Sequence, residues 1–207
     1  MLSKVVNNNI YSQASFVISC GNKKQFPENS IIEVAFAGRS NAGKSSALNT
    51  LTNQKKLAKI SKTPGRTQLI NYFSLPAQGK YLVDLPGYGY AKVPEEIKKK
   101  WEIFLGDYIL QRPQLGAIIL LMDIRHPMKS SDIILLECAA ERQIPVHILL
   151  TKADKLSQSA ASKALKDVKS EIVNWRAEFS AQVFSSLKRT GLEELIEKLN
   201  GFFELAN

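Results

Sequence analysis

The feature that most constrains this 207-residue chain is a glycine-rich run, GRSNAGKS, at residues 38–45. The run fits the pattern GxxxxGK[ST]; it follows a short apolar segment typical of a strand and opens a segment typical of a helix. Gly38 and Gly43 allow the backbone to wrap closely, which turns its N–H groups toward a phosphate. The start of the following helix adds its positive dipole end to the same anion site. We therefore predict a phosphate-binding loop rather than a chance glycine-rich turn.

Two side chains of this loop have predicted chemical roles. Lys44 would reach the β- and γ-phosphates of a nucleotide, and the Ser45 hydroxyl would ligate Mg²⁺. The motif does not by itself separate ATP from GTP. The nucleotide-binding residues expected in it are Gly38, Arg39, Ser40, Asn41, Ala42, Gly43, Lys44, Ser45 and Ser46.

The identity of the nucleotide base is predicted by a second motif, Thr151-Lys152-Ala153-Asp154, at the end of a predicted strand. An aspartate carboxylate there can accept hydrogen bonds from the ring N1–H and the amine of guanine, whereas adenine presents an acceptor at the same place. The stem of Lys152 would pack along the base. An isolated TKAD would more often be a solvated turn, but its position at the end of a strand after a phosphate loop favours guanine binding.

A third motif is Asp84-Leu85-Pro86-Gly87, at the end of another predicted strand. Asp84 would hold Mg²⁺ through water, and the Gly87 amide would contact the γ-phosphate. Because that contact exists only with GTP, the loop that follows should relax after hydrolysis. The alternative is an ordinary turn rich in Pro and Gly, and the position of the motif after the phosphate loop favours the functional interpretation.

Two weaker segments complete the predicted site. The polar run at 62–68 can supply a second hydroxyl to Mg²⁺, and spacing alone does not choose between Thr63 and Thr67. Phe184, Ser185 and Ser186 end the last predicted strand, where backbone amides could meet the guanine O6.

Short apolar runs alternate with amphipathic segments along the chain, which predicts an α/β fold with a mostly parallel sheet and helices on both faces. Residues 76–79 leave no room for a crossover helix, so two of the six strands should form a hairpin and the sheet should be mixed. Residues 1–24 are predicted to be a loosely attached extension and residues 25–207 a single domain. The predicted strands are Ile32–Ala37, Leu69–Leu75, Lys80–Asp84, Ala117–Asp123, Val146–Thr151 and Gln182–Ser185, and the predicted helices are Lys44–Thr52, Pro94–Leu110, Ser131–Arg142, Ala160–Ala177 and Leu192–Leu205.

The composition of the chain limits where the protein is expected to be located and what it is expected to bind. The net charge of +9 favours polyanionic partners, although a basic solvated surface is an equal alternative. Neither a membrane-spanning run nor a signal sequence is evident, so we expect a cytoplasmic protein with no membrane partner, a monomer in isolation. Cys20 and Cys138 lie in unrelated segments and are expected to be buried free thiols.

These motifs, in this order, resemble those of the TRAFAC-class P-loop GTPases, and most closely the EngB family of bacterial ribosome-assembly GTPases. The segments that carry the resemblance are GRSNAGKSSALN (38–49), KTPGRTQLINYF (62–73), LVDLPGYGYAKV (82–93), DIRHPM (123–128), LLTKADKL (149–156) and FSSLKRTGLEEL (184–195). The resemblance implies the P-loop GTPase fold, binding of GTP, GDP and Mg²⁺, and a switch function in assembly of the large ribosomal subunit that normal growth and cell division require.

The resemblance also implies site residues that spacing left open. It makes Thr67 the second Mg²⁺ ligand beside Ser45 and Asp84, and it assigns catalytic roles to Lys44, Thr67 and Gly87. It implies a switch segment that binds the nucleotide, formed by Gly65, Arg66, Thr67, Gln68 and Leu69.

Several residues depart from the commonest GTPase pattern. Thr151 stands where the guanine motif usually has Asn, a change that EngB-like sequences share. Asn41 resembles an asparagine that related GTPases use to bind K⁺; the resulting hypothesis of K⁺-stimulated hydrolysis would be contradicted by equal rates in KCl and NaCl. Tyr88 follows Gly87 where Ras-like enzymes orient water with Gln, so slow turnover is expected, and packing of the loop is an equally good role for Tyr88 and Tyr90.

Other functions remain open at this level. An ATP-dependent kinase or ATPase would leave TKAD without a role, and a GTP-regulated adaptor for a non-ribosomal partner would need no contact with RNA. His126 is expected in a loop or at an rRNA contact and His147 in the core, neither of them as a general base. The basic residues that we would test for rRNA contact are Lys55, Lys56, Lys59, Arg66, Lys98, Lys99 and Lys100.

Overall fold

The computed structural model describes residues 9–58, 69–88 and 95–204, with the side chains of 95–102 left out. Seven strands form one sheet: β1 (Ser15–Cys20), β2 (Ile32–Gly38), β3 (Ile70–Ser74), β4 (Lys80–Asp84), β5 (Leu115–Asp123), β6 (Val146–Thr151) and β7 (Phe179–Val183). The α-helices of these residues are α1 (Lys44–Leu51), α2 (Glu95–Gln111), α3 (Ser130–Glu141), α4 (Gln158–Ile172) and α5 (Leu192–Phe202). The predicted α/β class is confirmed.

The sheet is mixed, as predicted, with strand order β1-β3-β4-β2-β5-β6-β7. Strands β4, β2, β5, β6 and β7 are parallel neighbours, whereas β3 pairs antiparallel with both β1 and β4. The hairpin between β3 and β4 is the one that the short 76–79 connection predicted. Gly79 in that connection has a φ of 73°, and its missing Cβ leaves space for Ile31.

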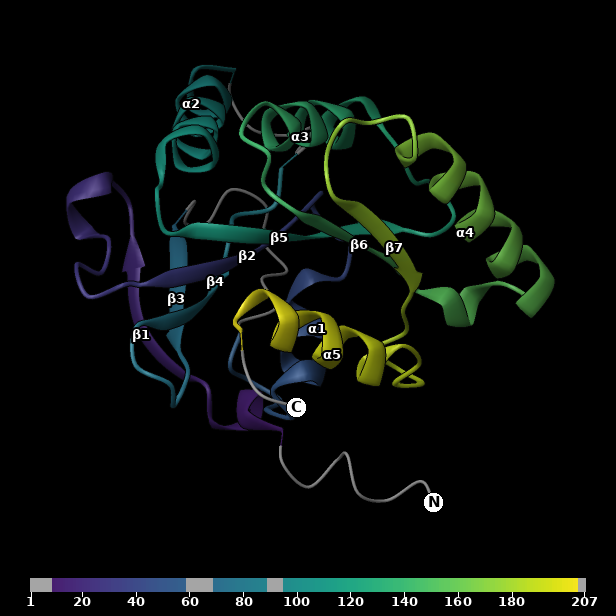
Figure 1. The fold of residues 1–207 in the computed structure, drawn as a ribbon, viewed down its shortest axis with the longest axis horizontal. Coiled ribbons are helices and arrows are strands. Elements are labelled where there is room, and N and C mark those ends of the chain that lie inside the picture. The colour runs from purple at the N-terminus through teal and green to yellow at the C-terminus, as the bar shows by residue number, and fades with distance from the viewer. Residues whose placement is uncertain (1–8, 59–68, 89–94, 205–207) are drawn as a thin grey trace.

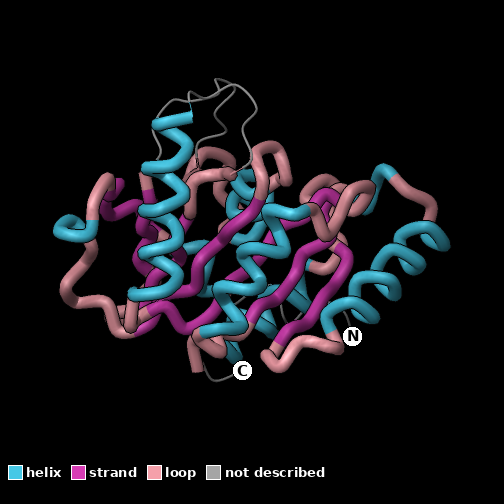
Figure 2. The backbone as a smooth tube through the Cα atoms, turned by 90° about the horizontal axis from the view of Figure 1, so that it is seen from above, coloured by secondary structure: helices cyan, strands magenta, loops and turns pink. Residues whose placement is uncertain are grey.

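Helices cover both faces of the sheet (Figure 1). On one face, α2, α3 and α4 enclose a core built around Tyr108, Leu136 and Val168. On the other face, α1 and α5 enclose a second core built around Leu48 and Leu195. Figure 2 shows the same helices and strands from above. The central strands are buried on both faces, which accounts for their continuous apolar sequences.

The sheet has seven strands where six were predicted. Residues 9–24, predicted to belong to a loosely attached extension, are instead packed against the domain. Strand β1 adds an edge next to β3, and Tyr11 before it is fully buried, with its hydroxyl donating to Asn200 Oδ1 at 2.9 Å. Four of the six residues of β1 are polar or exposed, including Phe16 and Val17, so the segment lacks the apolar signal of a central strand. Its pairing depends on contacts with residues at least 50 positions away.

Smaller boundary differences have local causes. Strand β7 spans Phe179–Val183 instead of Gln182–Ser185, because it pairs with β6 from Val146 to Leu150. Helix α4 ends at Ile172, earlier than predicted. Among the described residues, no helix is both long and apolar enough to cross a membrane. Cys20 is a buried free thiol as expected, whereas the free thiol of Cys138 is only half-buried.

His147 is a buried polar residue of β6, and its predicted role as a satisfied core histidine is confirmed. Its Nδ1 lies 2.8 Å from Ser180 Oγ and its Nε2 lies 2.7 Å from Gln182 Oε1, both on β7. Burial lowers the pKa of His147 to about 4. The folded chain therefore holds the neutral ring, whereas the unfolded chain binds a proton below about pH 6.5.

This difference predicts an acid-dependent loss of stability. The free energy of unfolding should fall by up to about 3 kcal/mol between pH 6.5 and pH 4, because protons bind preferentially to the unfolded chain. Urea titrations of His147→Gln should show a shallower pH dependence over this range. His126→Gln, at an exposed histidine, is the matched control and should keep the wild-type slope. Equal slopes for all three proteins would contradict the assignment.

Candidate nucleotide-binding site

The phosphate-loop motif has the strand–loop–helix context that the sequence predicted: β2 ends at Gly38 and α1 begins at Lys44. A Cβ at Gly38 would lie 2.7 Å from the Leu121 carbonyl oxygen on β5, so only glycine fits there. Gly43 has a φ of 98°, which a side chain would strain, and Asn41 adopts a φ of 63°. These conformations produce the sharp wrap that presents backbone N–H groups to an anion.

The structure brings the two charged groups of the predicted phosphate and metal site together. Lys44 Nζ forms an ion pair with Asp84 Oδ1, and both side chains are about 10% exposed (11% and 10%). Asn71 Nδ2 donates to the other carboxylate oxygen at 3.3 Å. The pair forms because β2 and β4 are parallel neighbours whose carboxyl ends meet, with Phe36 opposite Asp84.

Gly87 lies directly against the phosphate loop. A Cβ on Gly87 would be 3.2 Å from Ser40 Cα and 3.3 Å from Ser40 N, so a larger residue would push the two segments apart. The next residue, Tyr88, accepts a hydrogen bond from Ser40 N at 2.8 Å and donates its own N–H to Gly38 O at 3.4 Å. Hydrogen bonds therefore hold the end of the DLPG segment against the phosphate loop.

The Tyr88 side chain packs inward rather than toward the phosphates. Its hydroxyl donates to Asp132 Oδ1 at 2.9 Å, and burial together with this carboxylate raises the Tyr88 pKa well above its usual value. Asp132 is only 1% exposed, and its burial raises the pKa of its carboxyl group. The contacts support the packing role for Tyr88; Tyr90 lies outside the described residues. Sequence reasoning missed Asp132, because a lone Asp at a helix start is typical of a cap.

The base motif is tied to the phosphate loop by Thr151, the residue that stands in place of the usual Asn. The buried Thr151 hydroxyl lies 2.6 Å from the Ala42 carbonyl oxygen and 3.1 Å from that of Met122. One hydroxyl proton serves these acceptors, and the shorter contact is to the phosphate loop. Thr151 thus fixes the loop from the strand that carries the base motif.

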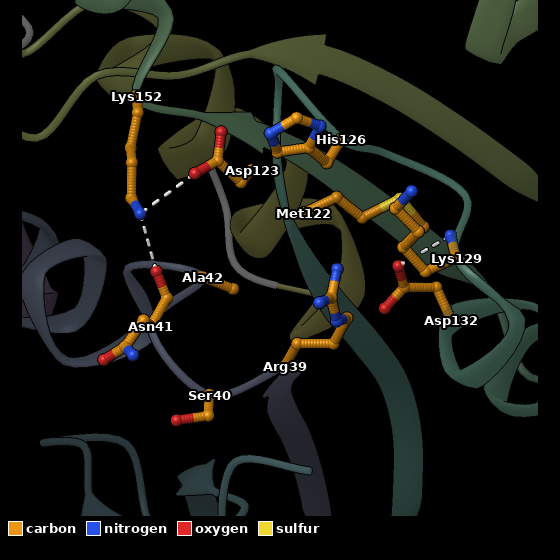
Figure 3. A pocket seen from close by; sticks show the side chains of 10 residues that line it. All are labelled: Arg39, Ser40, Asn41, Ala42, Met122, Asp123, His126, Lys129, Asp132 and Lys152. Carbon is orange, nitrogen blue, oxygen red and sulfur yellow. Dashed lines mark hydrogen bonds and ion pairs between the residues drawn. The ribbon is translucent and has the colours of Figure 1, made fainter. Parts of the chain in front are cut away.

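Lys152 makes a second tie. Its Nζ donates to the Asn41 carbonyl oxygen at 2.7 Å and lies 3.0 Å from Asp123 Oδ2 (Figure 3). Asp123 also accepts from Arg125 Nη2 at 2.6 Å, and these cations hold the Asp123 pKa well below its usual range. Sequence reasoning did not assign Asp123 to the site; its place at the end of a central strand was the available signal.

Asp154 is poised as an acceptor. Ser185 Oγ donates to Asp154 Oδ1 at 2.6 Å, and this hydrogen bond lowers the pKa of the carboxyl group. The Ser185 amide donates to Thr190 O and the Ala153 amide to Phe184 O, so these two N–H groups are engaged within the protein. The Ser185 side chain therefore orients Asp154. The sequence had suggested a different role, in which the backbone amides of residues 185 and 186 contact the base.

Part of the predicted site lies outside the described residues: Gly65, Arg66, Thr67 and Gln68 in the switch segment, with Thr63, Lys59 and the side chains of Lys98, Lys99 and Lys100. Leu69 is described and half-buried just before β3.

Comparison with known proteins decides the family. The model of the family described as "50S ribosome-binding GTPase" matches residues 33–152. The "Probable GTP-binding protein EngB" of Escherichia coli O1:K1 / APEC is 52% identical over 203 residues, 98% of this chain and 94% of that protein. The protein of the same description from Escherichia coli strain K12 / MC4100 / BW2952 is 53% identical over 193 residues, covering 93% and 91%.

The chain belongs to the EngB family of GTP-binding proteins. A crystal structure of a probable GTP-binding protein engB has the same fold, with a TM-score of 0.67 at 20% identity over 83% of this chain and 98% of that one. The predicted P-loop GTPase fold is confirmed, and membership of the EngB family indicates GTPase activity.

The Thr151 contact yields a test of how this EngB family member holds its phosphate loop. Thr151→Val would leave the buried Ala42 carbonyl without its partner, at a cost of about 1–3 kcal/mol. We expect GTP and GDP affinities to fall roughly tenfold, while the ratio of GTP to ATP affinity stays constant because Asp154 is untouched. Thr151→Ser keeps the hydroxyl and is the matched control in titration calorimetry. A changed GTP/ATP ratio, or unchanged affinity in the valine variant, would contradict this role.

Proposed function

We propose that this chain is a slow, Mg²⁺-dependent GTPase that acts in the cytoplasm as a switch in assembly of the large ribosomal subunit. The observation that carries the nucleotide part is the Asp154 carboxylate, held ionised and oriented by Ser185, on the same sheet edge as the phosphate loop. The ribosomal part is supported by the matching family description and by the net charge of +9.

The described residues fit a magnesium ion. Asp84 offers a buried carboxylate, and Ser45 lies in the first turn of α1 with its hydroxyl oxygen; such hard oxygen ligands are those that Mg²⁺ prefers. When bound, the ion would neutralise charge that develops on the phosphates. Thr67 as the second protein hydroxyl and K⁺ stimulation through Asn41 stay predictions.

In this proposal the chain's own groups change partners when nucleotide binds. Lys44, paired with Asp84 in the structure, would turn its ammonium to the β- and γ-phosphates, which frees the carboxylate for the metal site. The backbone amide of Gly87 would then report the γ-phosphate, and loss of that contact after hydrolysis would release the segment behind it.

Slow hydrolysis follows from Tyr88. At the place where Ras-like enzymes use Gln to orient the attacking water, this side chain is buried and its hydroxyl is committed to Asp132. We therefore expect a ribosomal partner to supply the group that orients the attacking water. We also expect the protein to be required for normal growth and cell division.

The nucleotide part is tested at Asp154. Asp154→Ala should weaken GTP binding by roughly 100-fold, because two hydrogen bonds to a charged acceptor are lost, while ATP binding should hardly change. Lys155→Ala removes the neighbouring exposed charge and is the control. Displacement of a bound fluorescent nucleotide by GTP, GDP or ATP measures the affinity of each variant for each nucleotide. Equal wild-type affinity for ATP and GTP, or retained guanine preference in Asp154→Ala, would overturn the assignment.

The ribosomal part is tested by co-sedimentation with purified 50S particles in GDP and in a non-hydrolysable GTP analogue. We expect binding that depends on the nucleotide and weakens steeply as salt rises from 50 to 200 mM, because RNA phosphates release counterions. Salt-independent binding, or no binding in either state, would instead favour an adaptor for a non-ribosomal protein.

A further inference from the structure

A cavity of about 350 Å³ lies on the outer side of the phosphate loop, between that loop and the connection from β5 to α3 (Figure 3). This volume is in the range of ligand-binding pockets. Neither Asp154 nor Ser185 borders it, so the cavity lies beside the predicted guanine site, with Lys152 and the phosphate loop forming the wall between the two. The cavity is lined by Arg39, Ser40, Asn41, Ala42, Met122, Asp123, His126, Lys129, Asp132 and Lys152.

The two carboxylates of the cavity are already satisfied. Asp123 is bound by Arg125 and Lys152. Asp132 accepts from the Tyr88 hydroxyl and, at 3.1 Å, from the Lys129 amide, and almost none of its surface is exposed. Neither carboxylate therefore has an unmet need for a cation from the cavity.

Two cations that line the same cavity favour the ionised form of Asp132 through their charge, but they form no direct ion pair with it. In the part of the chain that the structure describes, no carboxylate lies within ion-pair distance of the side chain of Arg39 or of Lys129. Arg39 is half-buried in the wall, and Lys129 and His126 are exposed at the rim. A half-buried guanidinium that lines the same cavity as an exposed lysine and an exposed histidine offers the kind of donors that suit a phosphate group.

We propose that this cavity, defined by Arg39, His126 and Lys129, is a second phosphate site that receives a backbone phosphate of RNA. The inference rests on the proposed ribosomal function, which supplies RNA as the partner, and deepens it by naming the contact. The net charge of +9 would draw the polyanion in, and the guanidinium of Arg39 would bind one phosphate directly.

The position of the cavity gives the contact a regulatory consequence. Arg39 belongs to the phosphate loop, and its backbone is bridged to Tyr88, the residue after Gly87. An RNA phosphate on Arg39 therefore touches the loop that wraps the nucleotide and the segment that reports the γ-phosphate. If RNA at this cavity changes the nucleotide affinity, linkage requires that the nucleotide change the RNA affinity by the same factor.

The test uses Lys129→Glu, with Lys166→Glu on the exposed face of α4 as a control that makes the same charge change elsewhere. Binding of the full-length GDP-loaded and GTP-analogue-loaded proteins to 50S particles and to a labelled 20-nucleotide RNA is measured at graded salt. Lys129→Glu should weaken both about tenfold and reduce the salt slope by about 1, while GTP binding is unchanged. Lys129→Arg should restore wild-type values.

The outcomes separate this inference from the proposed function. Equal losses in Lys129→Glu and Lys166→Glu would overturn the cavity as a phosphate site while leaving ribosome binding intact. A loss of 50S binding with an unchanged salt slope would mean that a protein group occupies the cavity, which also overturns the RNA contact. If wild type binds the labelled RNA through Lys129 but never 50S, the proposed function fails and the phosphate site stands; if it binds neither, both fail.

Discussion

The site depends on one constraint: the carbonyl groups on the outer side of the phosphate loop must have donors, so that the amides can face inward. Thr151 and Lys152 supply those donors to Ala42 and Asn41. Both come from the end of β6, two strands away from β2. The phosphate loop is therefore shaped as much by the strand that carries the base motif as by its own glycines.

This arrangement makes base recognition and phosphate recognition parts of one rigid body. Thr151 and Asp154 are three residues apart, so a shift of the β6 end that misplaces the carboxylate also loosens the loop. A threonine can replace the asparagine common in related enzymes because the position needs one short donor rather than an amide with two. The hydroxyl meets this need at 2.6 Å.

The motifs at strand ends could be predicted from sequence, because each depends on a local run of residues and on the rule that carboxyl ends of parallel strands meet. The ion pair of Lys44 and Asp84 follows from that rule once β2 and β4 are parallel neighbours, and the structure shows that they are. Asp132 and β1 could not be predicted, since the role of each is set by a distant partner. Asp132 acts through Tyr88, 44 positions earlier, and β1 through pairing with β3 across the hairpin.

Strand β1 also leaves the sheet with an open rim that carries Phe16 and Val17, 56% and 45% exposed. An unpaired strand edge can act as a template on which a second chain extends the sheet. The register between β1 and β3 shifts between Phe16 and Ile18, and such a bulge bends the strand and interrupts its row of hydrogen-bonding groups. A second strand could therefore pair with only a short stretch of β1 on either side of the bulge, which disfavours the growth of a fibril on this edge.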